Sequence, residues 1–289
     1  MLPLRFLGQT PQSPEDFDGV GLRNRVQDLH AALRVATEDS ARLALHAQLE
    51  TTWGEVLRSG TALDPAWEEL KGTIGWAEAG TGPELLRVVT WNVELSDRTQ
   101  RYGGFVLRGD HREPGGYRAY PLKHQPRSNV REVGKRFGGE VWPGAIYYQV
   151  ILTHDKRTPV YTLLGWDGAD GLTTRKVVEV LETQGGQVRL GAPRIQVRGA
   201  TQRRLVLEYA DVLSVLLRYE GDRIAMDHLS PRSPDLQGVA AFYGPDMTYD
   251  ALEWDGKQWV LRENVDIRDP QLDRTFPDPK APKSRRGPR

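Results

Sequence analysis

Side chains capable of acid–base chemistry gather in two short stretches of the last third of the chain. Asp227 and His228 are neighbours just before a Ser-Pro turn, and Asp246 and Asp250 enclose the sequence Met-Thr-Tyr. A carboxylate that orients an imidazole supports general acid–base catalysis. Carboxylates beside aromatic rings are typical of sugar-binding clefts and glycosidases. These four residues are therefore the candidate catalytic residues of a hydrolase, with carbohydrates as one class of substrate.

The same stretches also have a structural interpretation. Adjacent residues of a strand point to opposite faces, so Asp227 and His228 cannot form a hydrogen-bonded pair unless the strand has already ended. Asp227 would then satisfy backbone amides before the turn. Tyr243 and Tyr249 are candidate binding residues, yet tyrosines and aspartates also tie down the corners of β-sheets. The sequence leaves both interpretations open.

A third stretch, WDGADG over 166–171, follows a run that is typical of a strand. Trp166, Asp167 and Asp170 are candidate binding residues, because two close carboxylates can hold calcium through hard oxygen ligands. The loop lacks the further acids and the terminal glutamate of an EF-hand. The alternative is a plain turn in which the aspartates accept hydrogen bonds from backbone amides. Apart from calcium at Asp167 and Asp170, we expect no cofactor.

The six histidines are dispersed, and none forms an HxH or HExxH pattern, so the local sequence predicts no zinc site. The chain also lacks a GxSxG elbow, a P-loop and a GxGxxG turn after a strand. His30 and His46 fall on predicted helices, where we expect them at the surface or at its boundary.

The first elements of the chain are predicted to be helical. Leu22, Val26, Leu29 and Leu33 form one apolar stripe at helical spacing, and a second stripe follows from 45 to 56. Asp39-Ser40 supplies an N-cap between them, Gly60 a stop, and Asp64-Pro65 the start of a short helix. We expect an irregular arm over 1–19 and a helical segment over 20–83.

From residue 84 the apolar pattern changes to a period of two, which predicts a β-rich domain over 84–269. We expect an antiparallel sandwich or splayed barrel of about 10–12 strands, and α+β overall. The segment 173–182 can be a helix or a strand. Asp255-Gly256 predicts a two-residue hairpin turn that brings Trp254 beside Trp259. The expected strands are Leu85–Leu95, Tyr102–Arg108, Tyr117–Leu122, Ala145–Thr153, Val160–Trp166, Lys176–Glu182, Arg204–Tyr209, Val212–Tyr219, Arg223–Leu229, Tyr249–Trp254 and Gln258–Arg262.

Acidic and basic residues balance at 39 each. A chain without net charge has no long-range field that would attract nucleic acid or an anionic membrane, so neither is an expected partner. No apolar run reaches the length of about 18 residues that a transmembrane helix needs. There is no cysteine, which excludes disulfides, thiol catalysis and cysteine-ligated metals. The tail over 270–289 is rich in proline and basic residues, and we expect it to be disordered.

The sequence gives weak signals about location. The first residues, MLPLRFLG, lack the basic and long apolar regions of a signal peptide. The absence of an oxidisable thiol nevertheless suits an exported protein. We expect a periplasmic or envelope-associated location, with a partner in the cell envelope. A cytoplasmic location is the alternative.

Four stretches of the β-rich part carry a resemblance. VTWNVE (89–94), YTLLGWDG (161–168), DHLSP (227–231) and FYGPD (242–246) resemble a family of uncharacterised, exported β-rich proteins from Bacteroidetes-type bacteria. The resemblance covers residues 85–269. It implies a helical N-terminal part followed by a β-rich body, and export. It implies no activity and no catalytic residue.

Two functions from different classes follow. The first is a non-enzymatic exported or envelope-associated protein with a binding or structural role, favoured because no catalytic signature is recognised. The alternative is a hydrolase that uses aspartate and histidine side chains of the three stretches. If Asp167, Asp227, Asp246 and Asp250 converge with His228 in one open pocket, the enzyme is favoured. If each carboxylate bonds its own local backbone, the first function is favoured.

Overall fold

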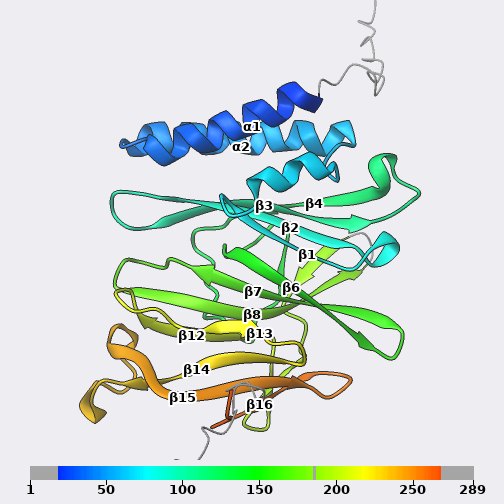
Figure 1. Cartoon of the computed structure of the whole chain (residues 1–289). Helices are drawn as coiled ribbons and strands as arrows, with labels where there is room; N and C mark the ends of the chain where they lie inside the picture. Colours follow the sequence, from blue (N-terminus) through cyan, green and yellow to red (C-terminus); the bar gives the residue numbers. More distant parts are fainter. Residues whose placement is uncertain (1–18, 185–186, 268–289) are drawn as a thin grey trace, which may run out of the picture.

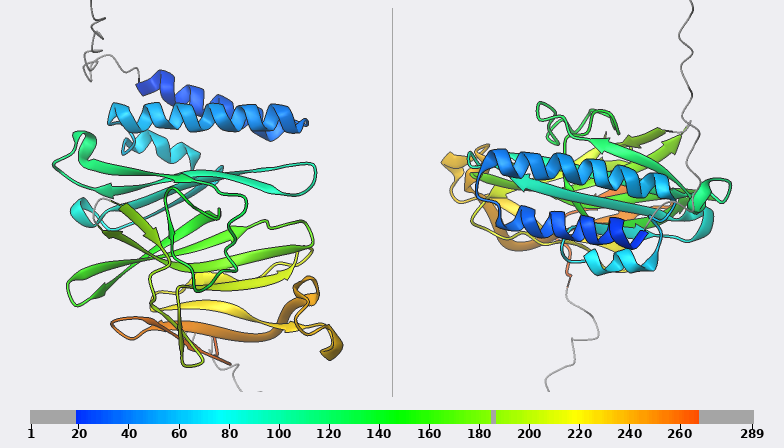
Figure 2. Two further views of the ribbon diagram at one scale, coloured as in Figure 1. Left: turned by 180° about the vertical axis from the view of Figure 1, so that it is seen from behind. Right: turned by 90° about the horizontal axis from the view of Figure 1, so that it is seen from above.

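The computed structural model of the protein describes residues 19–184 and 187–267. These residues form four stacked layers, a helical layer followed by three β-sheets (Figures 1 and 2). The stack confirms the prediction of a mainly β, α+β protein with sandwich-like antiparallel sheets and an N-terminal helical segment. The arm expected over 1–19 and the tail expected over 270–289 lie, apart from Gly19, outside the described residues.

The helical layer covers the first sheet. It contains α1 (Gly19–Val35), α2 (Asp39–Ser59) and the short 3₁₀ helix η2 (Pro65–Leu70). The stripes predicted from the sequence supply its buried side, with Val26 of α1 and Leu49 and Trp53 of α2 at its centre. Gly60 ends α2 with a left-handed φ of 78°, as its type predicts. None of the described helices is long and apolar enough to cross a membrane.

The start of α2 differs from the prediction. Asp39 is the first residue of the helix, and the residue before it, Glu38, makes no capping bond with its side chain. The Asp39 carboxylate instead accepts hydrogen bonds from the backbone N–H and the hydroxyl of Ser96, at 2.9 and 2.6 Å. A tertiary contact has therefore replaced the predicted local cap.

Sheet 1 lies directly beneath the helices. Its strands, in spatial and chain order, are β1 (Gly75–Ala79), β2 (Leu86–Glu94), β3 (Gln100–Gly109) and β4 (Tyr117–Lys123). β1 lies inside the range 20–83 that we expected to be helical. Its sequence, GWAEA, contains no β-branched residue, so the strand signal is weak. Pairing with β2 and burial of alternate residues, Gly75 and Ala77, hold it in the sheet.

Sheets 2 and 3 complete the stack. Sheet 2 contains β5 (Phe137–Gly138), β6 (Ile146–Asp155), β7 (Thr158–Asp167), β8 (Thr173–Gln184), β9 (Gln187–Leu190) and β12 (Arg204–Ala210). Sheet 3 contains β10 (Ile195–Val197), β11 (Ala200–Gln202), β13 (Leu217–Tyr219), β14 (Arg223–Pro231), β15 (Tyr243–Trp254) and β16 (Trp259–Arg262). The ambiguous segment 173–182 is strand, because β8 pairs with β7 on one side and with β9 and β12 on the other.

Two predicted strands differ from the observed ones by more than three residues at one end. Of the expected strand Val212–Tyr219 only β13 forms, and Val212 is 91% exposed. β15 begins earlier than predicted, at Tyr243. The turn between β15 and β16 spans 255–258 rather than two residues, because Trp254 pairs with Trp259. Their rings lie 5.4 Å apart, so the predicted cross-strand pair is confirmed.

Each gap between layers holds its own apolar core. Trp53 and Phe105 pack between the helices and sheet 1, Trp142 between sheets 1 and 2, and Trp259 between sheets 2 and 3. Sheet 2 also buries an ion pair, in which Arg204 and Glu179 are wholly shielded and 3.0 Å apart. Three packed interfaces make the sheets a rigid support for side chains at their edges.

Candidate functional site

The predicted catalytic residues meet in part, on sheet 3. His228 Nδ1 lies 2.8 Å from a carboxylate oxygen of Asp250, on the neighbouring strand β15. Asp246 approaches the other ring nitrogen to 3.9 Å. Asp227 does not join them, because its carboxylate accepts a hydrogen bond from the backbone N–H of Leu216 at 2.7 Å. The partner of His228 is thus across the sheet rather than adjacent in sequence.

A bulge produces this arrangement. The pairing of β14 with β15 shifts register between Asp227 and Leu229, at the position of His228. The hydrogen bond to Asp250 is the main cause that raises the pKa of His228 above its ordinary value. The ring is partly exposed, at the rim of a pocket of about 320 Å³. An imidazole held between two carboxylates can donate a proton, so acid–base chemistry is available here.

The two tyrosines predicted to bind near this site differ in position. Tyr243 lines the His228 pocket, and its hydroxyl accepts a hydrogen bond from the N–H of Gly238 at 3.0 Å. Tyr249 is partly buried and paired with Asp227 in the sheet, and among the described residues it does not line that pocket. Tyr243 therefore helps to shape the pocket, while its hydroxyl anchors the loop above it.

The WDGADG stretch lies elsewhere, between sheets 1 and 2. The two carboxylate oxygens of Asp167 accept hydrogen bonds from the hydroxyl of Tyr102 and from Arg175, both at 2.8 Å. Asp170 accepts from the backbone amides of Leu172 and Thr173, as in a plain turn. These contacts are those of the structural alternative. The calcium site stays a prediction.

The described contacts keep the candidate clusters apart. Trp166 is partly buried beside Gly168, near the Asp167 network and away from His228. Asp167 and Asp170 line a second pocket, of about 380 Å³, together with Arg175. Within 19–184 and 187–267 no group of three or more histidine, aspartate or glutamate side chains is arranged to hold a metal ion. Asp167 therefore does not converge with His228 in one pocket, so the condition that would favour the enzyme is not met.

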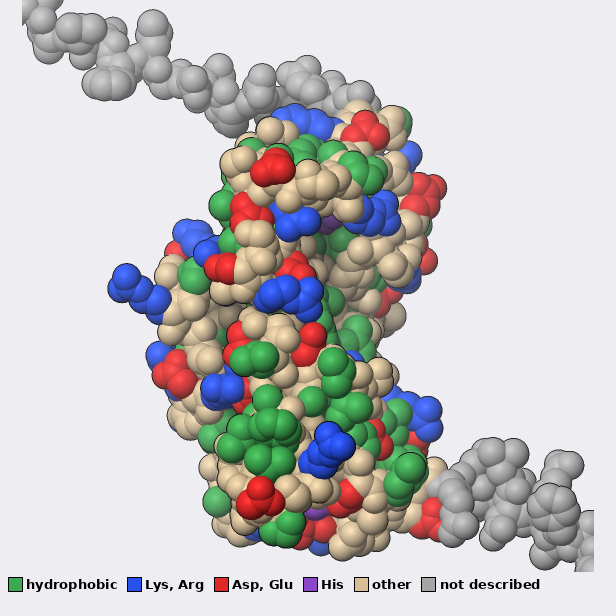
Figure 3. Space-filling model, turned by 90° about the vertical axis from the view of Figure 1, so that its left-hand side faces the viewer, with side chains coloured by type: hydrophobic (Ala, Val, Ile, Leu, Met, Phe, Trp, Pro, Cys, Tyr) green, Lys and Arg blue, Asp and Glu red, His purple; other side chains and the backbone are tan. Residues whose placement is uncertain are grey.

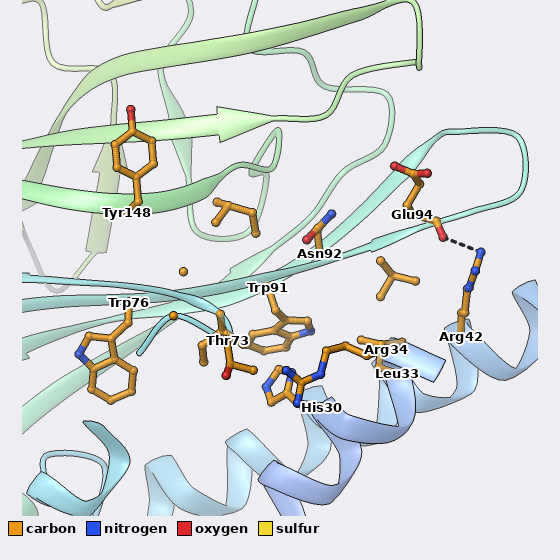
Figure 4. Close-up of a pocket in the computed structure, with 15 residues that line it drawn as sticks. His30, Leu33, Arg34, Arg42, Thr73, Trp76, Trp91, Asn92, Glu94 and Tyr148 are labelled. Carbon is orange, nitrogen blue, oxygen red and sulfur yellow. Dashed lines mark hydrogen bonds between the residues drawn. The ribbon is translucent and has the colours of Figure 1, made fainter. Parts of the chain in front are cut away.

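A larger pocket, of about 620 Å³, lies where the helical layer meets sheets 1 and 2. We call it the helix–sheet pocket. The side of the molecule drawn in Figure 3 is hollowed at this level. Figure 4 shows its residues, which come from the end of α1, the start of α2, the loop before β1 with the first residues of β1, the end of β2 and the start of β6. Apolar walls come from Leu33, Ile74, Val93, Ile146 and the rings of Trp76, Trp91 and Tyr148.

His30 is the unusual member of this pocket. We expected it at the surface or at its boundary, but only 4% of it is exposed, because it follows Val26 by one helical turn on the buried side of α1. Its Nε2 has no hydrogen-bond partner among the described residues. Burial, and then the charge of Arg34, lower the pKa of His30 to about 4. The ring is therefore neutral at pH 7, with one buried nitrogen left unsatisfied.

Trp91 separates the helix–sheet pocket from a neighbouring hollow that contains His46. Its indole N–H donates to Nδ1 of His46 at 3.1 Å, and its ring meets the edge of His30. His46 is half-buried, and burial together with Arg101 lowers its pKa to about 4. The two histidines thus flank the same tryptophan, yet only His46 is satisfied by it.

Two arginines reach the helix–sheet pocket from the helices. Arg42 donates to the carbonyls of Ala36 and Glu94, both at 3.0 Å. No hydrogen bond or ion pair joins the guanidinium of Arg34 to another residue of the described chain, and Figure 4 draws Arg34 beside His30. The Glu94 carboxylate is already bonded by Arg98 and Gln100. The uncompensated charge of the pocket is therefore positive.

Comparison of the chain with protein-family models, with curated proteins and with solved structures finds no match. The resemblance to exported β-rich proteins therefore stays a prediction, and so does the envelope location. Sequence reasoning missed the helix–sheet pocket, because its walls come from separate segments spread between residues 30 and 148. The available signal was the spacing of His30 from Val26, which places a polar ring on the buried face of a helix.

Proposed function

We propose that this protein is a binding module, and that the helix–sheet pocket holds an organic anion with an apolar body. The observation that carries the proposal is the buried, unpartnered Nε2 of His30 beside the unpaired guanidinium of Arg34. A polar atom buried without a partner costs about 1–3 kcal/mol, and such atoms are rare in folded proteins. A turn of the ring toward the pocket would present this nitrogen to a ligand, and the bond so formed would recover that cost.

The dimensions and lining of the pocket support a small ligand. Binding pockets typically have volumes of about 300–1,000 Å³, with mostly apolar walls and a few placed polar groups. Here Ile146, Tyr148 and Leu33 supply apolar surface, whereas His30 and Arg34 are the polar groups without a partner in the described chain. The other polar residues of the lining are Arg42, Thr73, Asn92 and Glu94. Guanidinium groups suit carboxylates, which they can bond in a bidentate manner. A carboxylate on a flat or branched apolar group is the simplest ligand that meets these demands.

The experiment compares two probes of the same shape, the anion indole-3-acetate and the neutral amide indole-3-acetamide. We expect the carboxylate to raise the melting temperature and to bind in calorimetry more tightly than the amide. Arg34→Gln should weaken binding of the carboxylate by about 10- to 100-fold, since a hydrogen bond to a charged group contributes about 1.5–3 kcal/mol. Arg58→Gln is the matched control, because Arg58 is an exposed arginine in the last turn of α2, outside the pocket. Equal binding of the two probes, or no effect of Arg34→Gln, would contradict the proposal.

A second candidate function is hydrolysis at His228, supported by its hydrogen bond to Asp250 in a partly apolar pocket. In that function His228 donates a proton to the leaving group, and Asp246 faces the other side of the ring. A panel of alkyl glycosides and alkyl esters tests it, because their alkoxide leaving groups need a proton, with His228→Gln as the variant. Turnover that survives unchanged in His228→Gln would rule this candidate out.

A further inference from the structure

The helix–sheet pocket exposes an unpaired part of a strand edge. β1 pairs with β2 only as far as Thr90, which lies opposite Gly75. β2 continues to Glu94, and on its other side it remains paired with β3 along this whole length. Beyond Gly75 no strand of the described chain is hydrogen-bonded to β2 on the β1 side, while β6 packs against the face of the sheet here, where the N–H of Tyr147 bonds the hydroxyl of Thr90. The lining of the pocket includes Gly75 and this end of β2.

The direction of the free backbone groups follows from their neighbours. The carbonyl of Leu85 and the N–H of Leu95 bond residues of the β3 side. The carbonyl of Glu94 and the N–H of Ser96 bond Arg42 and Asp39 of α2, on the opposite side. Backbone groups of successive strand residues alternate in direction. The N–H and C=O of Asn92 therefore aim away from β3, into the helix–sheet pocket, where Figure 4 places Asn92 at the centre.

We infer that the ligand of the helix–sheet pocket is a short, extended, acidic peptide segment that adds to β2 as a strand at Asn92. This inference rests on the proposed function and names its ligand class. An added strand pairs its own N–H and C=O with those of Asn92, which is the recurring mode of strand addition at an open sheet edge. It would lie in line with β1, antiparallel to β2.

The pocket sets the length of this segment. Trp91 to Glu94 are the residues of β2 beyond the end of β1, and at about 3.4 Å per residue they span roughly 14 Å. The loop before Gly75 closes one end of the gap, and Arg42 closes the other where it bonds Glu94. The peptide therefore contributes about four residues to the sheet.

The two sides of the pocket determine which side chains the peptide segment can carry. Side chains of an added strand alternate between the two faces of sheet 1. On one face they meet His30 and Arg34, so an acidic side chain fits there. On the other they meet Ile146 and Tyr148 of β6, so an apolar side chain fits there. The expected recognition pattern is an acidic residue between apolar ones.

The experiment uses N-acetylated, C-amidated tetrapeptides, with aspartate or glutamate fixed at one position and the others randomised among apolar residues. Binding is measured by calorimetry, and the best sequence is then N-methylated at one residue at a time. We expect a loss of tenfold or more at the residue opposite Asn92, and little change at its neighbours, whose N–H groups point away. Slower exchange of the Asn92 amide proton in the complex is the second readout.

The outcomes separate this inference from the proposed function. If indole-3-acetate binds through Arg34 but no tetrapeptide binds, the inference fails and the proposed function stands. If neither binds, both fail. A tetrapeptide whose affinity falls equally with every N-methylation also overturns strand addition. Because only the ligand is altered, misfolding of a variant cannot imitate any of these results.

Discussion

Replacing His30 by phenylalanine should stabilise the protein, which is unusual for a large buried residue. The Nε2 of His30 is buried without a partner, and its desolvation costs about 1–3 kcal/mol. Phenylalanine removes that cost and keeps the edge-on contact with Trp91. The adjoining pocket of about 620 Å³ leaves room for the larger ring. We expect a gain of about 1–3 kcal/mol in the free energy of unfolding, or about 2–4 °C in melting temperature for each kcal/mol.

His46→Phe is the matched control for this prediction. His46 and His30 both flank Trp91 and both have a pKa of about 4. Loss of His46 removes the acceptor of the buried Trp91 N–H, so this variant should be destabilised by about 1–3 kcal/mol. Urea unfolding at pH 7.5, where both rings are neutral, measures each variant, and unchanged m-values show that the transition is comparable. Equal destabilisation by both substitutions would refute the argument that Nε2 of His30 is unsatisfied.

Three further predictions concern charged and titratable side chains. Arg204→Met should lower the free energy of unfolding by about 3–5 kcal/mol, because it leaves the charge of Glu179 buried without a partner. Adding Glu179→Leu should restore most of that stability. Urea unfolding measures both variants, and an Arg204→Met variant as stable as the parent would contradict the prediction. His30, His46 and His124 have pKa values lowered to about 4, so the unfolded chain binds protons before the folded chain does as the pH falls. The free energy of unfolding should therefore decrease from about pH 6.5 to pH 4, at up to about 1.4 kcal/mol per pH unit for each ring. A urea midpoint that stays constant over that range would contradict this prediction. The pKa of His228 is raised, so its bond to Asp250 should stabilise the fold fully at pH values below the ordinary histidine pKa. The charge-dependent part of that stabilisation should disappear as the pH rises through the raised pKa. Urea unfolding at pH 9 checks this, because the stability of His228→Gln should then approach that of the parent.

Much of the sheet architecture could be predicted from the sequence, because strands that bury one face carry a period of two. β2, β7 and β14 lie close to their predicted bounds. The failures have local causes. β1 lacks β-branched residues, and its place in sheet 1 is set by pairing with β2. The apolar run at Val212 is typical of a strand, yet the chain turns there and leaves it exposed.

The site was harder to predict than the fold. The chemistry expected of His228 was placed with Asp227, but a register shift brought Asp250 to the ring instead. Spacing along one strand cannot reveal a partner on the next strand, because the register across a bulge is a tertiary property. The same limit applies to His30. Helical spacing places it on a buried face, but only the full packing shows that nothing bonds its Nε2.

The contacts around the unpaired edge of β2 favour binding of a short segment at this position and disfavour pairing with a long strand of another chain. Exposed strand edges invite pairing with other chains, and proteins restrict them with charges and coverings. Here Asp39 and Arg42 of α2 bond Ser96 and Glu94, so the helix closes the edge beyond the pocket. The residual gap at Asn92 is too short for a long strand of a second copy to continue through it. The start of α2, where Asp39 bonds Ser96 instead of capping the helix, thus limits the length of a segment that can bind to the edge of sheet 1.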